Sequence, residues 1–329
     1  MSDFKNILLI NFGGIGDEIL FLPVIQALKK EYPTSKITLC LEGRSKAFLN
    51  LTNLVDAHFF ADIKTKNKYL EMIKLYFKAL LGKYDLVVSS GANPLIATLL
   101  FFTGIKTRIG YKTTNLSNKL LTHAVSLNKN QYASMMYFDL VKPITSKDFE
   151  LPIINIENFE KNKNSVLIHP GVSKISILKN ITKTFDAKKW ADIIKLLLKK
   201  GKNVYLAGGP DDAECIEIIR KELKDTDITN FIDLYGKTQN IFELVELIKK
   251  SEVLICSDSA PMHIGVATST KTIAIFGPTD DTTLLPKSDK FIVLKNNANC
   301  RPCLWAKRQT SCKELKCLDI DINQILDLI

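Results

Sequence analysis

The chain has 329 residues, of which 46% are hydrophobic and 24% charged, a composition typical of a globular protein that is long enough for two domains with their own cores. Its 45 basic and 35 acidic residues give a formal net charge of +10, which favours a polyanionic partner such as a phospholipid, a phosphorylated saccharide or nucleic acid. No RNP sequence or tandem zinc finger accompanies that charge, and no apolar run reaches the length of a transmembrane helix, so we expect neither a nucleic-acid partner nor a membrane span.

The predicted elements alternate between strand and helix from the N-terminus. The first residues contain no basic region and no small-residue cleavage site, so we expect no signal peptide and a cytoplasmic protein. They run into a buried strand at 6–12 and a turn, Gly13-Gly14-Ile15-Gly16-Asp17, that leads to a helix. The next predicted elements are the helix at 18–31, a strand at 36–41, an amphipathic basic helix at 66–81, a strand at 86–88 and a buried helix at 95–105.

The second half shows the same alternation after residues 143–164, a polar stretch without periodicity that we interpret as a linker. Its predicted elements are strand 165–168, helix 186–200, strand 203–207, helices 211–224 and 240–250, strand 252–256, helix 261–268 and strand 272–276. Continuous apolar strands between helices are typical of parallel sheets covered on both faces. We therefore predict an α/β fold of two doubly wound, Rossmann-like domains, residues 1–150 and 151–329, with a ligand at the carboxyl ends of the strands, in the cleft between the domains.

The motif richest in chemistry is Ser257-Asp258-Ser259-Ala260-Pro261-Met262-His263, directly after an apolar strand. Asp258 or Ser259 can cap a helix there, and Pro261 suits its first turn. Free backbone N–H groups at such a helix start favour an anion such as a pyrophosphate, which His263 can reach from about one turn later. The motif predicts a phosphorylated ligand, and a strand–turn–helix corner without a ligand is the alternative.

Other turns offer groups for the same ligand. Gly171 permits close approach of the backbone, and Ser173 and Lys174 can donate hydrogen bonds to phosphate. A lysine ammonium such as that of Lys183 stabilises the charge that develops on a departing pyrophosphate. The turn Gly208-Gly209-Pro210-Asp211-Asp212 places acids where a ribose can bind, although its alternative role is to cap the next helix.

Asp17 stands at the entrance of the first helix, where a carboxylate can act as a general base or simply cap the helix. The same glycine turn also resembles half of a dinucleotide fingerprint, with Glu42 as the acid for the ribose. The third glycine of that fingerprint is absent at the required spacing. An NAD(P)-dependent dehydrogenase is therefore a weaker alternative.

Four of the seven cysteines cluster near the C-terminus as Cys300-x2-Cys303-x8-Cys312-x4-Cys317. Cytoplasmic proteins seldom keep disulfides, so the spacing indicates a structural metal site with zinc or iron held by thiolates. Four reduced, unligated thiols are the alternative. A closed structural site has no open coordination position, so we assign it no catalysis. No Asp-x-Asp motif stands in a convincing loop, and we therefore expect no catalytic metal.

Together these motifs resemble glycosyltransferase family 9, the bacterial heptosyltransferases. The resemblance covers nearly the whole chain and rests on Asn11-Phe12-Gly13-Gly14-Ile15-Gly16-Asp17-Glu18 with Pro23, on Asp258–His263, and on Phe276-Gly277-Pro278-Thr279. It implies a GT-B architecture in which residues 1–150 bind the acceptor and 151–329 bind the nucleotide sugar. It also implies ADP-heptose as donor and the lipopolysaccharide inner core, an anionic glycolipid, as acceptor.

The resemblance further implies roles for single residues. Asp17 matches the catalytic base of an inverting single displacement, and Lys183 matches a lysine at the donor phosphate or heptose. The donor loop is matched by Asp258, Ser259, Ala260 and His263. The acid for the nucleotide ribose is matched by Asp211 or Asp212, and Gly171 and Val172 stand where some members carry hydroxyl residues that Ser173 can replace.

The acceptor is the least determined part. Gly14, Arg44 and Lys46 are candidate acceptor contacts in a basic N-terminal domain, whose Lys64, Lys66 and Lys68 can also meet a membrane surface. A lipid acceptor places the protein at the inner face of the cytoplasmic membrane, where the helix at 66–81 either lies against headgroups or, as we prefer, packs on the sheet. The cysteine cluster looks like that of a branch acting on proteins, so a protein acceptor is an alternative, as are another nucleotide sugar and a non-catalytic glycolipid-binding protein.

Overall fold

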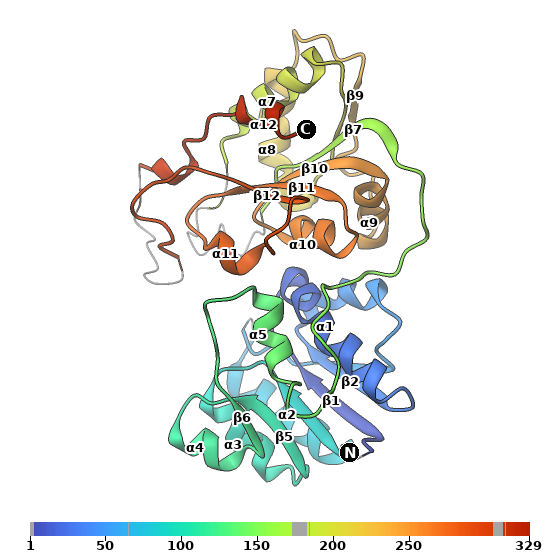
Figure 1. Ribbon diagram of the computed structural model, residues 1–329, viewed down its shortest axis with the longest axis vertical. Coiled ribbons are helices and arrows are strands. Elements are labelled where there is room, and N and C mark those ends of the chain that lie inside the picture. Colours follow the sequence, from blue (N-terminus) through green and yellow to red (C-terminus); the bar gives the residue numbers. More distant parts are fainter. Residues whose placement is uncertain (1–2, 65, 173–182, 184, 305–311, 313) are drawn as a thin grey trace. The chain divides into compact units, whose positions relative to one another are not determined.

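The computed structural model describes residues 3–64, 66–172, 183, 185–304, 312 and 314–329. The chain divides into two compact units, Met1–Ile154 (unit 1) and Asn155–Ile329 (unit 2). Each unit contains a six-stranded parallel sheet with helices on its faces (Figure 1). This architecture confirms the predicted α/β class with two doubly wound domains.

The sheet of unit 1 has the strand order β3-β2-β1-β4-β5-β6. Its elements are β1 (Asn6–Ile10), α1 (Ile15–Glu31), β2 (Lys36–Leu41), the 3-10 helix η1 (Gly43–Leu51), β3 (Ala57–Phe60), α2 (Lys68–Leu81), β4 (Leu86–Ser89), α3 (Pro94–Phe102), β5 (Thr107–Tyr111), α4 (Asn115–Leu120), β6 (His123–Val125) and α5 (Ala133–Asp139). The apolar residues of β1 from Ile7 to Ile10 are all 0% exposed, because this central strand is covered on both faces. The order reverses between β1 and β4, and this switch point leaves room for side chains at the carboxyl end of β1.

The sheet of unit 2 has the order β12-β11-β10-β7-β8-β9, which is the same topology as in unit 1. Its elements are β7 (Asn162–His169), α7 (Ala187–Lys199), β8 (Asn203–Leu206), η2 (Pro210–Asp212), α8 (Ala213–Glu222), β9 (Phe231–Asp233), α9 (Ile241–Lys250), β10 (Ser251–Ser257), α10 (Ala260–Ala267), β11 (Lys271–Phe276), α11 (Asp281–Leu284), β12 (Phe291–Lys295), η3 (Lys316–Leu318) and α12 (Gln324–Asp327). Trp190 of α7 is fully buried, with Phe185 edge-on to its ring at 5.5 Å. The switch point lies between β7 and β10.

Two sequence predictions need correction. The helix expected to be buried at 95–105 is α3, but Phe101 is 44% and Phe102 is 65% exposed, because only one face of the helix meets the sheet. The linker expected at 143–164 ends earlier, since 162–164 already belong to β7. Because these three residues are polar and exposed, the start of the strand cannot be recognised as part of an apolar run.

Helix α2 packs on the sheet as preferred, through Leu75 and Ala79, which join the core around Leu8 and Ile10. None of the helices in the described part of the chain combines the length and the hydrophobicity that crossing a membrane requires.

Candidate active site

The first group of site residues lies where β1 leads into α1. The Asp17 carboxylate accepts a hydrogen bond through Oδ2 from the backbone N–H of Gly14 at 2.8 Å, and the Asp17 carbonyl accepts one from Asn11 Nδ2 at 3.3 Å. A Cβ atom on Gly13 would lie only 2.2 Å from that of Asp17. The glycine is therefore required so that the carboxylate can fold back against the turn. Asp17 is a helix cap, and among the described residues none donates to its Oδ1.

Glu18, the next residue, is buried in unit 1 with 0% of its surface exposed. Neither carboxyl oxygen has a hydrogen-bond partner in the described part of the chain. Burial raises the pKa of Glu18 to about 8, because a charged carboxylate loses its hydration there. A hydrogen bond from the Asn11 amide would lower the pKa of Glu18. The Asn11 amide, however, donates to the Asp17 carbonyl. Glu18 is therefore mostly protonated near neutral pH.

Two of the three predicted acceptor residues lie near Asp17. Arg44 Nη1 would be 3.9 Å from a Cβ atom on Gly14. The Arg44 guanidinium is held through Nε by Glu42 Oε2 at 2.6 Å, and the other oxygen of Glu42 accepts the Lys64 N–H at 2.9 Å. Both oxygens of this buried carboxylate are thus engaged, which argues against the ribose contact of a dehydrogenase. Lys46 is exposed, and no contact joins it to this group.

The second group of site residues lies after β10, at the switch point of unit 2. Ser259 occupies the N-cap position of α10, as predicted, but neither it nor Asp258 caps the helix with its side chain. The Ser259 hydroxyl instead approaches the Ser257 carbonyl at 3.4 Å. No side-chain cap therefore engages the start of α10. Pro261 has no N–H, and the Met262 N–H donates to the Ser259 carbonyl at 3.1 Å, so the Ala260 N–H is the group that can receive an anion.

Asp258 is turned away from the helix start toward two partners. Its Oδ2 accepts the Thr279 hydroxyl at 2.5 Å and pairs with Lys183 Nζ at 2.9 Å. Asp258 is 4% exposed, so burial strengthens this pair. The structure thus brings Lys183 to the donor loop and gives Asp258 the role of holding the lysine.

Two histidines flank the switch point. His263 is 6% and His169 is 7% exposed, and His263 lies in the first turn of α10. Burial lowers the pKa of His169 to about 4, so its imidazole is neutral at pH 7, and its Nδ1 has no partner among the described residues. The Ser257 hydroxyl donates to the Pro170 carbonyl at 2.7 Å, which ties the two loops together.

The turn after β8 repeats the arrangement seen at Asp17. Asp212 Oδ2 accepts the Gly209 N–H at 2.8 Å, and a Cβ atom on Gly171 would lie 1.9 Å from Asp212 Oδ1. Burial raises the pKa of Asp212 to about 6. Asp212 is thus committed to the fold, whereas Asp211 is exposed. Asp211 is the better candidate for a ribose contact.

A pocket lies beside this turn. Its lining combines apolar side chains with acids and includes Val172, Phe185, Asp186, Asp211, Cys215 and Ile218. Such a mixture suits the flat base and the hydroxyl groups of a nucleoside. Ser173 and Lys174, the predicted phosphate donors, lie outside the described residues.

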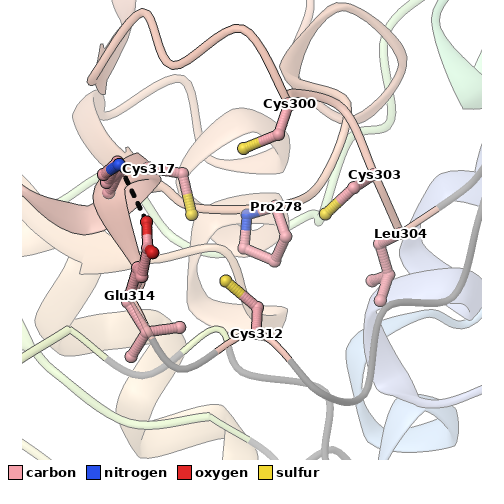
Figure 2. A pocket seen from close by; sticks show the side chains of 9 residues that line it. Pro278, Cys300, Cys303, Leu304, Cys312, Glu314 and Cys317 are labelled. Atoms are coloured by element: carbon pink, nitrogen blue, oxygen red, sulfur yellow. Dashed lines mark ion pairs between the residues drawn. The ribbon is translucent and has the colours of Figure 1, made fainter.

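The four clustered cysteines line one pocket next to Pro278, and their sulfur atoms point into it from Cys300, Cys303, Cys312 and Cys317 (Figure 2). All four are free thiols. Burial raises the pKa of Cys303 and of Cys317, and the neighbouring cysteines add to both shifts. In the part of the chain that the structure describes, no three potential ligand side chains stand close enough to hold a metal.

The chain resembles known proteins over most of its length. A family model described as glycosyltransferase family 9 (heptosyltransferase) matches residues 73–315. Lipopolysaccharide heptosyltransferase 3 of Escherichia coli is 28% identical over an alignment of 300 positions, which covers 84% of this chain and 85% of that protein.

Solved structures give the same result for the fold. The structure of E. coli ADP-heptose LPS heptosyltransferase II matches with a TM-score of 0.75 at 20% identity, covering 98% of this chain and 97% of that one. A more distant likeness is to the iron-containing dodecameric glycosyltransferase TibC from enterotoxigenic E. coli, with a TM-score of 0.54, 12% identity, and 99% and 76% coverage. The predicted GT-B fold class is thus confirmed.

Proposed function

The chain belongs to glycosyltransferase family 9, and on that premise we propose that it transfers a heptosyl group from ADP-heptose to an acceptor in the lipopolysaccharide inner core. The heptosyl group and the acceptor are supported by the names of its relatives, which are lipopolysaccharide and lipooligosaccharide heptosyltransferases, and the donor by the name of the structural relative ADP-heptose LPS heptosyltransferase II. The observation that carries the assignment to this chain is the Lys183–Asp258 pair at the start of α10, where no side-chain cap engages the helix. A cation beside an uncapped helix start, here the Ala260 N–H, suits a pyrophosphate.

Unit 2 supplies the donor contacts in this proposal. The diphosphate lies at the N-terminus of α10, within reach of Ser259, Ala260 and His263, and the nucleoside occupies the pocket that contains Asp211. Gly171 allows the backbone to approach the phosphates. As ADP departs, Lys183 and the helix dipole stabilise the negative charge on its terminal phosphate.

Unit 1 supplies the base. Asp17 Oδ1 takes the proton of an acceptor hydroxyl as its oxygen attacks the anomeric carbon, the bond between that carbon and the phosphate oxygen breaks, and ADP leaves from the opposite face. This single displacement inverts the anomeric configuration. Gly14 and Arg44, which lie beside Asp17, contact the acceptor, and Arg44 suits its phosphates or carboxylates. Lys46 is exposed and contributes to the same basic surface.

Incubation of the protein with ADP-heptose and an inner-core glycolipid tests the proposal, since the acceptor should gain the mass of one heptosyl unit. A parallel reaction with a protein acceptor, and others with UDP- and GDP-sugars, separate the alternatives. In Asp17→Asn the amide oxygen can still accept the Gly14 N–H, so the fold is kept while turnover falls about a hundredfold or more. Asp211→Asn is the matched control, because it should weaken donor binding with less effect on kcat. Unchanged turnover in Asp17→Asn would overturn the role of the base.

The four clustered cysteines suit a structural zinc or iron ion. Four soft thiol donors from one pocket form the ligand set of such sites, and the distant structural relative TibC is described as iron-containing. In the described part of the chain no three of these thiols stand close enough to hold an ion, so in this proposal they draw together when the ion binds. An ion held by all four thiolates has no open position and would serve the fold of unit 2. Elemental analysis of the purified protein should find about one zinc or iron per chain, and replacement of Cys300 and Cys303 by Ser should abolish it. Metal-free protein of unchanged stability would contradict this assignment.

We also place the protein at the cytoplasmic face of the inner membrane, because α2 and α3 carry apolar side chains that unit 1 leaves uncovered. Phe77 is 52% and Phe102 is 65% exposed, and the Tyr76 hydroxyl joins the two helices by donating to the Phe102 carbonyl at 3.4 Å. The exposed apolar side chains of this face also include Tyr69, Leu70, Ile73 and Leu81. Helix α2 itself carries Lys68, Lys74 and Lys78, and Lys64, Lys66 and Lys83 stand close to its ends in the sequence. Apolar side chains among lysines suit an anionic lipid surface.

Co-sedimentation with vesicles tests this placement. Vesicles that contain an anionic phospholipid should retain more protein than purely zwitterionic ones, and Phe77→Ser combined with Phe102→Ser should reduce the bound fraction severalfold. Phe242→Ser is the control, because Phe242 is 38% exposed but lies on α9 of unit 2. Equal binding by the double variant and the wild type would contradict the placement.

A further inference from the structure

The segment that carries the first two clustered cysteines is fastened to the loop Gly277–Asp281, which we call the donor-support loop. The backbone N–H groups of Cys303 and Leu304 both donate to the carbonyl of Pro278, at 3.0 and 3.2 Å. A Cβ atom on Gly277 would lie 2.9 Å from Cδ2 of Leu318, the residue after Cys317. Both ends of the cysteine cluster therefore contact the same loop.

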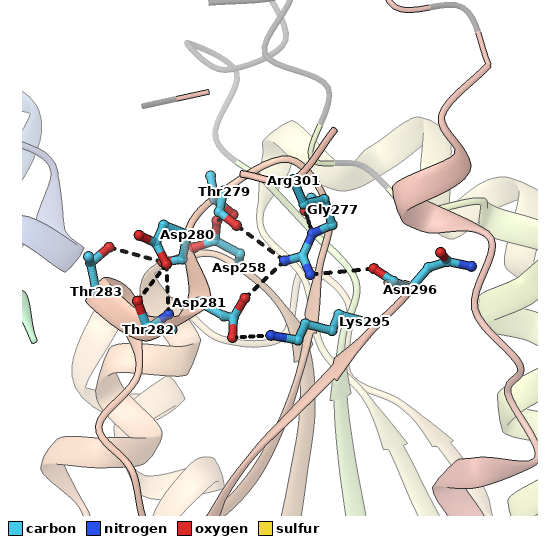
Figure 3. Close-up of polar contacts among 10 residues, drawn as sticks. All are labelled: Asp258, Gly277, Thr279, Asp280, Asp281, Thr282, Thr283, Lys295, Asn296 and Arg301. Atoms are coloured by element: carbon cyan, nitrogen blue, oxygen red, sulfur yellow. Dashed lines mark hydrogen bonds and ion pairs between the residues drawn. The ribbon is translucent and has the colours of Figure 1, made fainter. Parts of the chain in front are cut away.

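Arg301, between Cys300 and Cys303, makes the strongest connection. Its side chain is only 7% exposed and pairs through Nη2 with Asp281 Oδ1 at 3.1 Å. The same guanidinium donates to the carbonyl of Gly277 at 2.5 Å and to that of Thr279 at 3.2 Å, as Figure 3 shows. A planar guanidinium presents its donors in a fixed fork, so it fixes the relative positions of all the acceptors that it binds.

The donor-support loop in turn reaches the donor lysine. The hydroxyl of Thr279, whose carbonyl Arg301 holds, donates to Asp258 Oδ2, and the same oxygen pairs with Lys183. Thr279 is 1% and Asp258 is 4% exposed. A continuous chain of buried polar contacts thus runs within unit 2 from the cysteine segment to the side chain that we assign to the donor diphosphate.

We propose that ligation of the clustered thiols and binding of the donor nucleotide are energetically coupled, with Arg301 as the positioning residue that connects the two sites. The proposal rests on the donor assignment made above. A metal ion on the thiols fixes the segment on both sides of Arg301, Arg301 fixes the donor-support loop, and Thr279 and Asp258 then hold Lys183 ready for a phosphate. When the ion is lost, the backbone that carries Arg301 is no longer held in place. The donor-support loop then becomes less ordered.

Coupling of this kind must be reciprocal, so it can be measured from either site on the wild-type full-length chain. Calorimetry should show that zinc-loaded protein binds ADP at least about fivefold more tightly than protein stripped by a chelator, the lower end of typical coupling between two sites. Competition against a chromophoric chelator should show that ADP tightens zinc binding by the same factor. Equal ADP affinity of loaded and stripped protein would overturn the coupling.

Variants locate the connection. Arg301→Gln should still bind zinc, yet its ADP affinity should no longer depend on zinc, and Arg301→Lys should recover only part of the dependence. Lys316→Gln is the matched control, because Lys316 lies in the same cluster but pairs with Glu314. Coupling of wild-type strength in Arg301→Gln would show that Arg301 is not the connecting residue.

Hydrogen exchange separates failure of this proposal from failure of the donor assignment. If the zinc-loaded wild-type protein bound no ADP at all, the assignment of unit 2 as the donor-binding unit would be wrong. Amide exchange in residues 277–281 would then still decide whether the thiols govern the loop. Faster exchange after zinc removal supports the connection, and unchanged exchange refutes it.

Discussion

Replacing Glu18 by Gln should stabilise the folded protein, and the gain should grow as the pH rises from 5 to 9. The carboxyl of Glu18 is fully buried without a hydrogen-bond partner among the described residues, and burial raises its pKa from 4.5 to about 8. Between these two values the folded chain keeps a proton that the unfolded chain releases. The free energy of unfolding therefore falls as the pH rises through this window.

The size of the effect follows from the shift. Each unit of pKa corresponds to 1.36 kcal/mol, so the move from 4.5 to about 8 costs the wild type at most about 5 kcal/mol of stability above pH 8. Glutamine has nearly the same volume and does not titrate. The free energy of unfolding of Glu18→Gln should therefore not fall over this pH range through residue 18. The difference between variant and wild type should be small at pH 5 and should approach its full value at pH 9.

Urea denaturation at pH 5, 7 and 9 measures this difference. Circular dichroism is the suitable probe, because residues 1–154 contain no tryptophan whose fluorescence could report on the unfolding of unit 1. Glu42→Gln is the control. Glu42 is equally buried but is paired with Arg44, so the loss of its charge should destabilise the protein by about 1–3 kcal/mol. Parallel pH profiles of Glu18→Gln and wild type would refute the reasoning.

Three further changes test unit 2. Asp258→Asn removes the partner of Lys183, so kcat/KM should fall at least about tenfold in steady-state assays, and an unchanged value would show that the pair is not needed. Gly171→Ala places a Cβ atom against the Asp212 carboxylate, which should cost about 1–3 kcal/mol in denaturant melts and weaken ADP binding in calorimetry; wild-type values would contradict the required close contact. His169, whose pKa is lowered to about 4, takes up a proton more readily once unfolded, so wild-type stability should drop as the pH falls from 6.5 to 4. His169→Leu should show a shallower drop, and an equally steep one would exclude this histidine as the cause.

The fold was largely predictable from the sequence because the central strands and the long helices carry clear local patterns. The run Ile7–Ile10 is apolar throughout, and the glycine turn after it marks the start of α1. The strands β3, β5, β6, β9 and β12 were not predicted. Of these, β6 and β9 have only three residues each, which are too few to show a period of two. Their place at the sheet edge depends on pairing with β5 and β8, which no local pattern encodes.

The site was predictable only in part. Motifs identified Asp17, Lys183 and Asp258 one by one, but the contact between Lys183 and Asp258 depends on the fold that brings them together. Glu18 was missed as a buried group, because acids in the first turn of a helix are usually exposed caps. One signal was present, since every residue of α1 from Ile19 to Leu28 except Gln26 is apolar. A helix that is apolar on all its faces is buried, and so are the polar residues on it.

The bond between Gly14 N–H and Asp17 Oδ2 also bears on regiochemistry. In the proposed role of Asp17 as base, proton abstraction would be confined to the lone pairs of its other oxygen, Oδ1, whose direction is set by the backbone rather than by a free rotamer. A polyhydroxylated sugar can then present just the alcohol that lines up with that direction. The hydrogen bond that caps α1 would thus determine which hydroxyl of the acceptor is glycosylated.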